Sequence, residues 1–283
     1  MEQNRECYRF VKRAFDDGIL TSTVDATYII HLEGNGRLTS IENQLQKYHP
    51  TNTVYILFNK GYKNCKKDAH ITIPPLDLVD AFLQVFKHAQ NEKYGNILIL
   101  EDDFLFDDKI NEPFHQENIN HFLQSHENQC FTYFLGCIPM FQIPCDYYNY
   151  YVLVSGGMHS CIYSRSYRDK VLLIDQKQIA DWDAYFNTIP NTVPNGVHYN
   201  YYIPLCYQLF PVTDNSSHWG SESTVSACFC MLAKIIIKWL NLDKSIEPGY
   251  SIVYALSKII PIAILLLIIF VIYRQFPKKR KSQ

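Results

Sequence analysis

Several features that would place this chain in a common class are missing. Its nine cysteines contain no pair separated by two residues, so a zinc site of the Cys-x-x-Cys kind has no support. Nine cysteines in 283 residues also do not indicate a disulfide scaffold, and the opening stretch MEQNRECYRFVKRAFDD lacks the apolar core of a secretory signal. We therefore expect reduced thiols and a body that lies in the cytosol.

Positive charge is scarce outside the C-terminal tail. The chain holds 26 Lys and Arg against 28 Asp and Glu, yet five of the basic residues lie in the last ten, RQFPKKRKSQ. Residues 1–273 therefore hold 21 basic against 28 acidic groups, a net charge of -7. An acidic body with no basic stripe argues against nucleic acid as a partner.

Low-complexity linkers and internal repeats are absent as well. With 47% hydrophobic and 19% charged residues, the chain is not broadly disordered and can bury a sizeable core. We divide it into an N-terminal segment (1–25), a main domain (26–225), an amphipathic juxtamembrane region (226–250), a membrane helix (252–273) and a basic tail (274–283).

The membrane helix is predicted from IVYALSKIIPIAILLLIIFVIY, 22 residues in which Lys258 is the single charge. About 20 mostly apolar residues cross the hydrocarbon core of a bilayer. Lys258 lies near one end, where its ammonium group can snorkel toward the membrane surface. We expect a protein that spans the membrane once, in contact with lipid, rather than a soluble protein with an apolar core helix.

The orientation of the span stays open. A basic tail prefers the cytosolic side, which would place the body outside the cytosol without a signal to take it there. The alternative, a cytosolic body and a short tail that crosses, is the one we expect. The sequon at Asn215 matters only for a lumenal body. We expect residues 228–240 to form a helix, with Lys234 and Lys238 on one face, that lies in the membrane interface or packs on the body.

Strands and helices alternate in the first hundred residues. ATYIIHL (26–32), TVYILF (53–58) and ILIL (97–100) are expected strands, and Thr39 with Glu42 suggests a capping box that starts a helix between the first two. A second helix is indicated by apolar residues at i, i+3, i+4 and i+7, namely Val79, Phe82, Leu83 and Phe86. The pattern predicts an α/β fold with a mostly parallel sheet flanked by helices, which binds ligands at the carboxyl ends of its strands.

Five carboxylates closely follow the third strand in the stretch NILILEDDFLFDD (96–108). In an extended chain Glu101 and Asp103 point to one side and Asp102 to the other. Two carboxylates that converge suit a hard cation such as Mg²⁺ or Mn²⁺. The alternative is a solvated acidic loop at the end of the strand; three consecutive acids in this frame favour the metal site.

The stretches ILILEDD and YIIHLEGNGRL resemble the Rossmann-like type A glycosyltransferase fold. Within it the closest resemblance is to family 25, the lipopolysaccharide and procollagen galactosyltransferase group, including uncharacterised members from large DNA viruses. Further matches follow in order over residues 26–220: FLGC, GGMHSCIYSRSYRDKVL, Trp182-Asp183 and YQLFPVTDNSS. The chain departs from the family at His31, where Asn is usual, at Met158, where Thr is usual, and in its C-terminal anchor.

The resemblance implies a metal-dependent hexosyltransferase of glycoprotein biosynthesis, with a nucleotide-sugar donor (a UDP-sugar is expected) and a glycan or protein acceptor. The predicted membrane helix adds a membrane anchor to this enzyme. Glu101, Asp103 and His218 would hold the metal. The donor would meet residues near the strand ends: His31, Leu32, Arg37, Asn59 and Asp102. Asp183 or Asp181 would act as the base, and Trp182 and His159 would contact the acceptor.

Each of these residues also has an ordinary explanation. Asp181 can cap a helix, His218 can be a packed surface residue, and His159 can lie at a strand edge. Two other functions stay open for the whole chain. One is a metal-dependent phosphohydrolase or nuclease, although such sites gather acids from several strand ends. The other is a non-catalytic structural or interaction protein that keeps a transferase fold.

Overall fold

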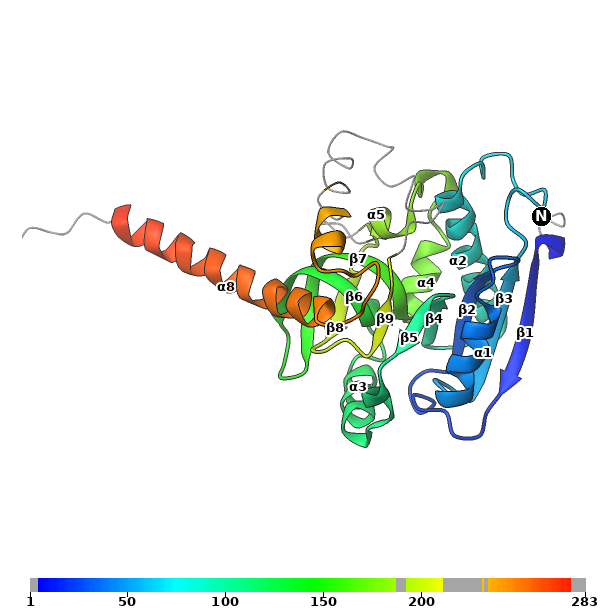
Figure 1. Ribbon diagram of the computed structural model, residues 1–283, viewed down its shortest axis with the longest axis horizontal. Helices are drawn as coiled ribbons and strands as arrows, with labels where there is room; N and C mark the ends of the chain where they lie inside the picture. Colours follow the sequence, from blue (N-terminus) through cyan, green and yellow to red (C-terminus); the bar gives the residue numbers. More distant parts are fainter. Residues whose placement is uncertain (1–4, 187–191, 211–230, 232–233, 276–283) are drawn as a thin grey trace, which may run out of the picture.

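The computed structural model describes residues 5–186, 192–210, 231 and 234–275 (Figure 1). The central sheet contains, in spatial order, β1 (Tyr8–Ala14), β3 (Thr53–Asn59), β2 (Ala26–Leu32), β4 (Ile97–Glu101), β7 (Asn149–Tyr163), β6 (Phe131–Pro144) and β8 (Val197–Tyr201). β3, β2, β4, β6 and β8 run in one direction, and β1 and β7 run in the other. The prediction of an α/β fold with a mostly parallel sheet is confirmed.

Helices cover both faces of this sheet (Figure 1). They are α1 (Leu38–Lys47), α2 (Pro74–Asn91), α3 (Pro113–Ser125), α4 (Arg165–Val171) and α5 (Trp182–Phe186), with short 3₁₀ turns at Arg5–Cys7, Asp108–Asn111 and Gln176–Gln178. Successive residues of β2 alternate between the faces. Tyr28 and Ile30 pack in one core with Phe82 of α2, whereas Ile29 packs in a second core with Ile41 of α1.

The start of α1 differs from the prediction. Arg37 is the N-cap residue, and its side chain makes no capping hydrogen bond to the helix. The predicted capping box of Thr39 and Glu42 is therefore wrong. Glu42 instead accepts a hydrogen bond from Arg13 of β1, 2.9 Å away, so a long-range ion pair takes the place of the local cap.

β6 and β7 form a hairpin of 14- and 15-residue strands, longer than the short apolar runs that the sequence suggests. The register between them shifts several times, for example between Phe134 and Gly136 and between Pro139 and Phe141. These bulges interrupt the two-residue alternation that would identify a long strand. A second, two-stranded sheet joins β5 (Phe104–Phe106) to β9 (Cys206–Gln208), and it brings the end of the main domain beside the acidic stretch.

The C-terminal helix α8 (Gly249–Gln275) begins on the body and then leaves it (Figure 1). Tyr250, Val253, Tyr254 and Ser257 are buried against the body, whereas the side chains from Ile259 to Tyr273 are mostly exposed. The span Gly249–Arg274 has a mean hydropathy of 2.8 in its most apolar window, of which 6% is buried, unlike a core helix. α8 is thus long and apolar enough to cross a membrane, as predicted.

Cys7 and Cys65 form a disulfide that joins the start of β1 to the loop after β3, with their Cα atoms 5.6 Å apart. The expectation of reduced thiols is wrong for this pair, because the sequence does not show which two cysteines the fold brings together. Of the other cysteines in the described part of the chain, four are buried: Cys130, Cys137, Cys161 and Cys206.

Candidate active site

The acidic stretch lies where it was predicted, at the carboxyl edge of the parallel strands. Glu101 ends β4 and pairs with Ile30 near the end of β2, and Asp102 and Asp103 follow in the turn before β5. Ile97 to Leu100, just before them, are fully buried. The fold therefore holds three carboxylates at the edge where α/β proteins bind their ligands.

Asp102 holds the loop between β2 and α1. Its carboxylate accepts hydrogen bonds from the Leu32 backbone (3.1 Å), Asn35 Nδ2 (2.6 Å) and Arg37 Nη1 (2.7 Å), and it lies 3.2 Å from His31 Nδ1. Burial alone would raise the pKa of Asp102, but the bonds from these partners outweigh burial and lower that pKa. Asp102 is therefore an anionic anchor whose oxygens already have partners.

The anchored loop contains two glycines in left-handed conformations, Gly34 (φ 83°) and Gly36 (φ 80°). A side chain at either position would be strained by its backbone. The loop ends at Arg37, whose guanidinium bridges Asp102 Oδ1 (2.7 Å) and Asp103 Oδ2 (3.0 Å). Burial tends to lower the pKa of Arg37, but the neighbouring carboxylates more than compensate and raise it. A permanent cation thus lies beside the acids.

Asp103 is held from the other side by Gln208 of β9. Gln208 Nε2 donates to Asp103 Oδ1 (2.9 Å), while the backbone of Gln208 is fixed by the Tyr250 hydroxyl of α8, which accepts from its N–H (3.0 Å) and donates to its carbonyl (2.9 Å). Gln208 was not among the predicted site residues, although it lies in the quoted stretch YQLFPVTDNSS. The helix α8 therefore contacts the site through one intermediate residue.

Asp183 joins this group from α5. It accepts hydrogen bonds from the backbone N–H groups of Gly157 (2.9 Å) and Met158 (3.1 Å). Burial, and then the charge of Asp181, raise the pKa of Asp183 to about 7. The pKa of Glu101 is also raised, first by burial and then by the charges of Asp103 and Asp183. The structure thus brings Glu101, Asp103 and Asp183 into one electrostatic environment.

Asp181 has a different position. It accepts a hydrogen bond from the Ala184 N–H (2.8 Å) and so caps α5. Burial raises its pKa too. Its carboxylate, however, caps the start of the helix, which is the alternative to catalysis that the sequence left open for Asp181. Between the two predicted bases, the geometry favours Asp183.

Two predicted acceptor contacts are contradicted by burial. The Trp182 side chain is 2% exposed, stacks on Phe82 at 4.2 Å and donates from Nε1 to Tyr163, so neither of its faces is open to a sugar. His159 is fully buried. Burial lowers its pKa to about 4, so the ring is neutral. Its Nε2 lies 3.3 Å from the carbonyl of Cys206, and its Nδ1 has no hydrogen-bond partner among the described residues.

Asn59, at the end of β3, belongs to a separate polar cluster. Its amide donates to Asp77 (2.9 Å) and accepts from Lys67 (2.7 Å), whose side chain is fully buried. Lys67 also bonds Asp77 and Tyr8, each at 2.5 Å, and Tyr8 in turn donates to Asp80 at 2.6 Å. We call these five residues the Lys67 cluster. Nothing in the sequence around Lys67 predicted it.

Within the part of the chain that the structure describes, no group of three His, Cys, Asp or Glu side chains is placed to hold a metal ion. His218, the predicted third ligand, lies outside the described residues. Glu101 and Asp103 supply two hard carboxylates of the kind that Mn²⁺ and Mg²⁺ prefer, so the donor chemistry fits while the ligand set stays a prediction.

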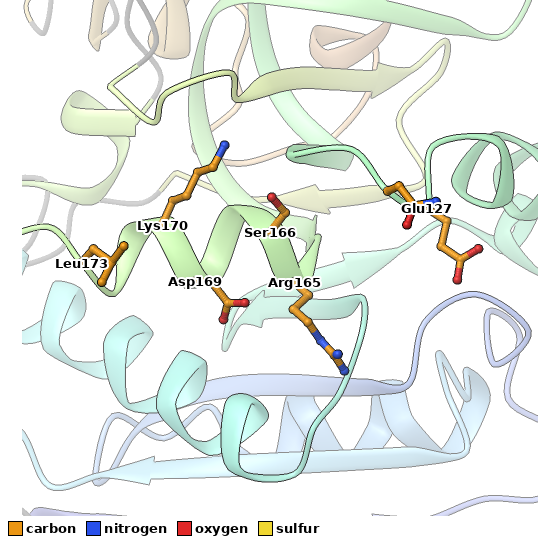
Figure 2. A pocket seen from close by; sticks show the side chains of 7 residues that line it. Glu127, Arg165, Ser166, Asp169, Lys170 and Leu173 are labelled. Carbon is orange, nitrogen blue, oxygen red and sulfur yellow. The ribbon is translucent and has the colours of Figure 1, made fainter.

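Figure 2 shows a surface depression lined by seven residues: Glu127, Asn128, Arg165, Ser166, Asp169, Lys170 and Leu173. It lies at the opposite edge of the sheet from Glu101, because β7 ends there beside the start of β4. Its cations already have partners, since Arg165 donates to backbone carbonyls of the loop before β4 and Lys170 to that of Pro194. We assign no function to it.

No protein-family model matches the chain, and no curated protein matches it. Among solved structures it is similar to A197 from STIV (12% identity, 67% of this chain and 86% of that one, TM-score 0.37). It is also similar to a mannose-1-phosphate geranyltransferase from Thermus thermophilus (10% identity, 62% of this chain and 73% of that one, TM-score 0.36). A third similar structure is a glycosyltransferase involved in the glycosylation of the major capsid of PBCV-1 (12% identity, 63% of this chain and 82% of that one, TM-score 0.34). These similarities are weak, so no residue role is transferred from them.

Proposed function

We propose that this chain is a metal-dependent glycosyltransferase that moves a hexose from a nucleotide-sugar, a UDP-sugar, to a glycan or protein acceptor. The observation that carries the proposal is the position of Glu101 at the carboxyl edge of the parallel strands, where it experiences the charges of Asp103, Asp183 and Arg37, together with the ion pair of Arg37 and Asp103. The resemblance of ILILEDD to the family 25 enzymes supports the same reaction class.

Glu101 and Asp103 would hold Mn²⁺ or Mg²⁺, with His218 as the expected third ligand. Such an ion stabilises the negative charge that a diphosphate acquires when it leaves the sugar. Arg37 adds a fixed positive charge at the same place, suited to a phosphate oxygen. Asp102 keeps Arg37 there through its 2.7 Å bond, so its role is to position the loop rather than to touch the donor.

Asp183 would take the proton from the acceptor hydroxyl if the reaction inverts the sugar configuration. A general base works best when its pKa is near the working pH, and the pKa of about 7 for Asp183 meets this condition. The two backbone N–H donors of Gly157 and Met158 fix its orientation.

A phosphohydrolase is less well supported. Such sites use carboxylates from several strand ends around two ions, but β2 and β3 end in Leu32 and Asn59. Near the end of β3, Asp77 is paired with Lys67 at 2.5 Å, and Glu33, which follows β2, lies 3.9 Å from Arg9.

Membrane attachment through α8 is part of the proposal. Because disulfides persist in oxidising compartments, the Cys7–Cys65 bond favours a body outside the cytosol and a cytosolic basic tail. This is the orientation that we did not expect from the sequence. Expression in eukaryotic cells followed by glycosidase treatment tests it, since the sequon at Asn215 is modified in this orientation and unmodified in the other.

The activity test uses the full chain in detergent, because Tyr250 of α8 fixes Gln208 and a truncated body would lose that support. Release of nucleotide from a panel of UDP-hexoses is measured with Mn²⁺ and with EDTA. We expect release that needs Mn²⁺ and is lost in Asp103→Asn but kept in Asp108→Asn, an exposed acid of the same stretch. Metal-independent release, or activity retained in Asp103→Asn, would contradict the proposal. No nucleotide binding at all would favour the non-catalytic alternative.

A further inference from the structure

The level at which α8 enters the membrane is marked by Lys258. Ser257, one residue earlier, is buried, and Ile259, one residue later, is 57% exposed. Lys258 itself is docked on the body: its Nζ donates to the Tyr202 carbonyl (2.5 Å) and lies 4.6 Å from the centre of the Tyr150 ring. The body therefore ends where the exposed apolar part of α8 begins.

The β6–β7 hairpin crosses α8 at this level. Successive contacts connect the two elements: Cys137 with Tyr254, and Gln142 Nε2 with Ser257 Oγ at 2.7 Å. The tip of the hairpin, residues 145–148, begins three residues after Gln142. Figure 1 shows that α8 leaves the body on the side where β6 and β7 lie.

The surface around the hairpin tip is aromatic. Tyr147 is 93% exposed and Phe114, at the start of α3, is 48% exposed. Tyr148 lies between them, with its ring centre 5.4 Å from that of Phe114 and 5.5 Å from that of Tyr202. Because the Tyr202 carbonyl binds Lys258, these contacts connect the tip to Lys258. We call Phe114, Tyr147, Tyr148, Tyr150 and Tyr202 the tip cluster.

The acid in the hairpin turn, Asp146, does not oppose contact with a lipid surface. Asp146 accepts hydrogen bonds from the backbone of Tyr148 and from both the backbone and the side chain of Asn149. Its carboxylate is therefore stabilised within the turn. Glu112 lies 3.5 Å from His115 and is exposed beside α3. Tyrosine is enriched where membranes meet water, because its ring is apolar and its hydroxyl can stay hydrated.

We propose that the tip cluster contacts the headgroup region of the bilayer, so that α8 and the hairpin together hold the body against the membrane. The inference rests on the membrane span of α8 but not on the enzymatic activity. The argument is continuity: Tyr150 and Tyr202 of the tip cluster contact Lys258, and the long run of mostly exposed apolar side chains in α8 begins at the next residue, Ile259.

The test places an indole at the tip of the full chain, reconstituted in phosphatidylcholine vesicles. Tyr147→Trp is compared with Leu173→Trp, an 86% exposed site on the body near the depression in Figure 2. Both variants carry Trp219→Phe and Trp239→Phe, which leaves the buried Trp182 as a common background. Lipids brominated near the headgroup should quench the indole at position 147 several-fold more than the one at position 173.

Flotation of the same vesicles separates the two parts of the argument. Protein that fails to float with lipid contradicts both the span and the tip contact. Protein that floats while positions 147 and 173 are quenched equally contradicts the tip contact alone. An indole at position 147 that is shielded from aqueous acrylamide but not quenched by lipid would assign the tip cluster to a protein partner, and would also overturn the proposal.

Discussion

Two buried acidic groups lie near the carboxyl ends of β3 and β4, which flank β2, and they differ in how their charge is balanced. In the Lys67 cluster, Asp77 and Asp80 are shared among Lys67, Tyr8 and Asn59. At the end of β4, among the described residues, Arg37 is the cation whose charge acts on Glu101, Asp102 and Asp103. The first group is complete without a ligand, whereas in the second three acids share Arg37 and the pKa values of Glu101 and Asp103 are raised. We expect this excess of acids, together with the raised pKa values, to mark a binding site.

The largest expected effect concerns the base. Asp183→Asn should lower kcat by about 10²–10⁴, the usual contribution of a general base, since an amide cannot take the proton. The matched control is Asp181→Asn, because an asparagine still caps α5. Nucleotide release under saturating donor measures both. An equal decrease of kcat in the two variants would mean that the activity depends on the structure of α5 and not on the Asp183 carboxylate.

Removal of Lys67 from the Lys67 cluster should lower the free energy of unfolding. Lys67→Met leaves Asp77 buried without its partner, which costs about 3–5 kcal/mol when one member of a buried ion pair is removed. Urea unfolding measures the loss, and the exposed Lys63→Met serves as the control. If Lys67→Met lowers the free energy of unfolding no more than Lys63→Met does, the ion pair of Lys67 and Asp77 does not stabilise the fold.

Sequence patterns predicted β2, β3, β4, α2 and the acidic edge, because short-range periodicity defines them, but they missed β1, which lies in the segment set apart as residues 1–25. The rest depends on contacts across long distances in the chain. Trp182 was expected to contact the acceptor, but its ring stacks on Phe82, a hundred residues earlier. Gln208 and Lys67 acquire their roles only when β9 and the loop after β3 fold against residues far away in sequence.

The acids at the end of β4 should also make stability depend on pH. Glu101 and Asp183 have pKa values above their usual range when folded, so the folded chain keeps protons that the unfolded chain has lost above about pH 4. Stability should therefore fall as pH rises from about 4 to 7. Glu101→Gln should raise the unfolding free energy of the metal-free protein at pH 8 by about 1–2 kcal/mol. Asp77→Asn should lower it instead.

A gain from Glu101→Gln that persists unchanged in saturating Mn²⁺ would contradict a metal role, because the ion should stabilise only the native carboxylate. Urea unfolding at pH 5 and pH 8, with and without Mn²⁺, covers all these cases.

The smallest effect is expected at the contact between α8 and the site. Tyr250→Phe removes the hydroxyl that fixes Gln208, at a cost of about 1–2 kcal/mol in hydrogen bonding. We expect the Mn²⁺ concentration for half-maximal activity to rise several-fold, with kcat at saturating Mn²⁺ little changed. Tyr254→Phe, one turn further along α8, loses bonds to Cys137 and Asn200 and should not shift the Mn²⁺ dependence. The same shift in both variants would indicate general loosening of the helix.

The central claim is that the carboxylates after Leu100 bind a divalent ion together with the phosphates of a nucleotide, and thermal unfolding of the full chain with Mn²⁺ and UDP tests it most directly. The account predicts that the two ligands together raise Tm more than either one alone, and that the joint increase disappears in Asp103→Asn but not in Asp108→Asn. An unchanged Tm with both ligands, or an equal increase in Asp103→Asn, would contradict it.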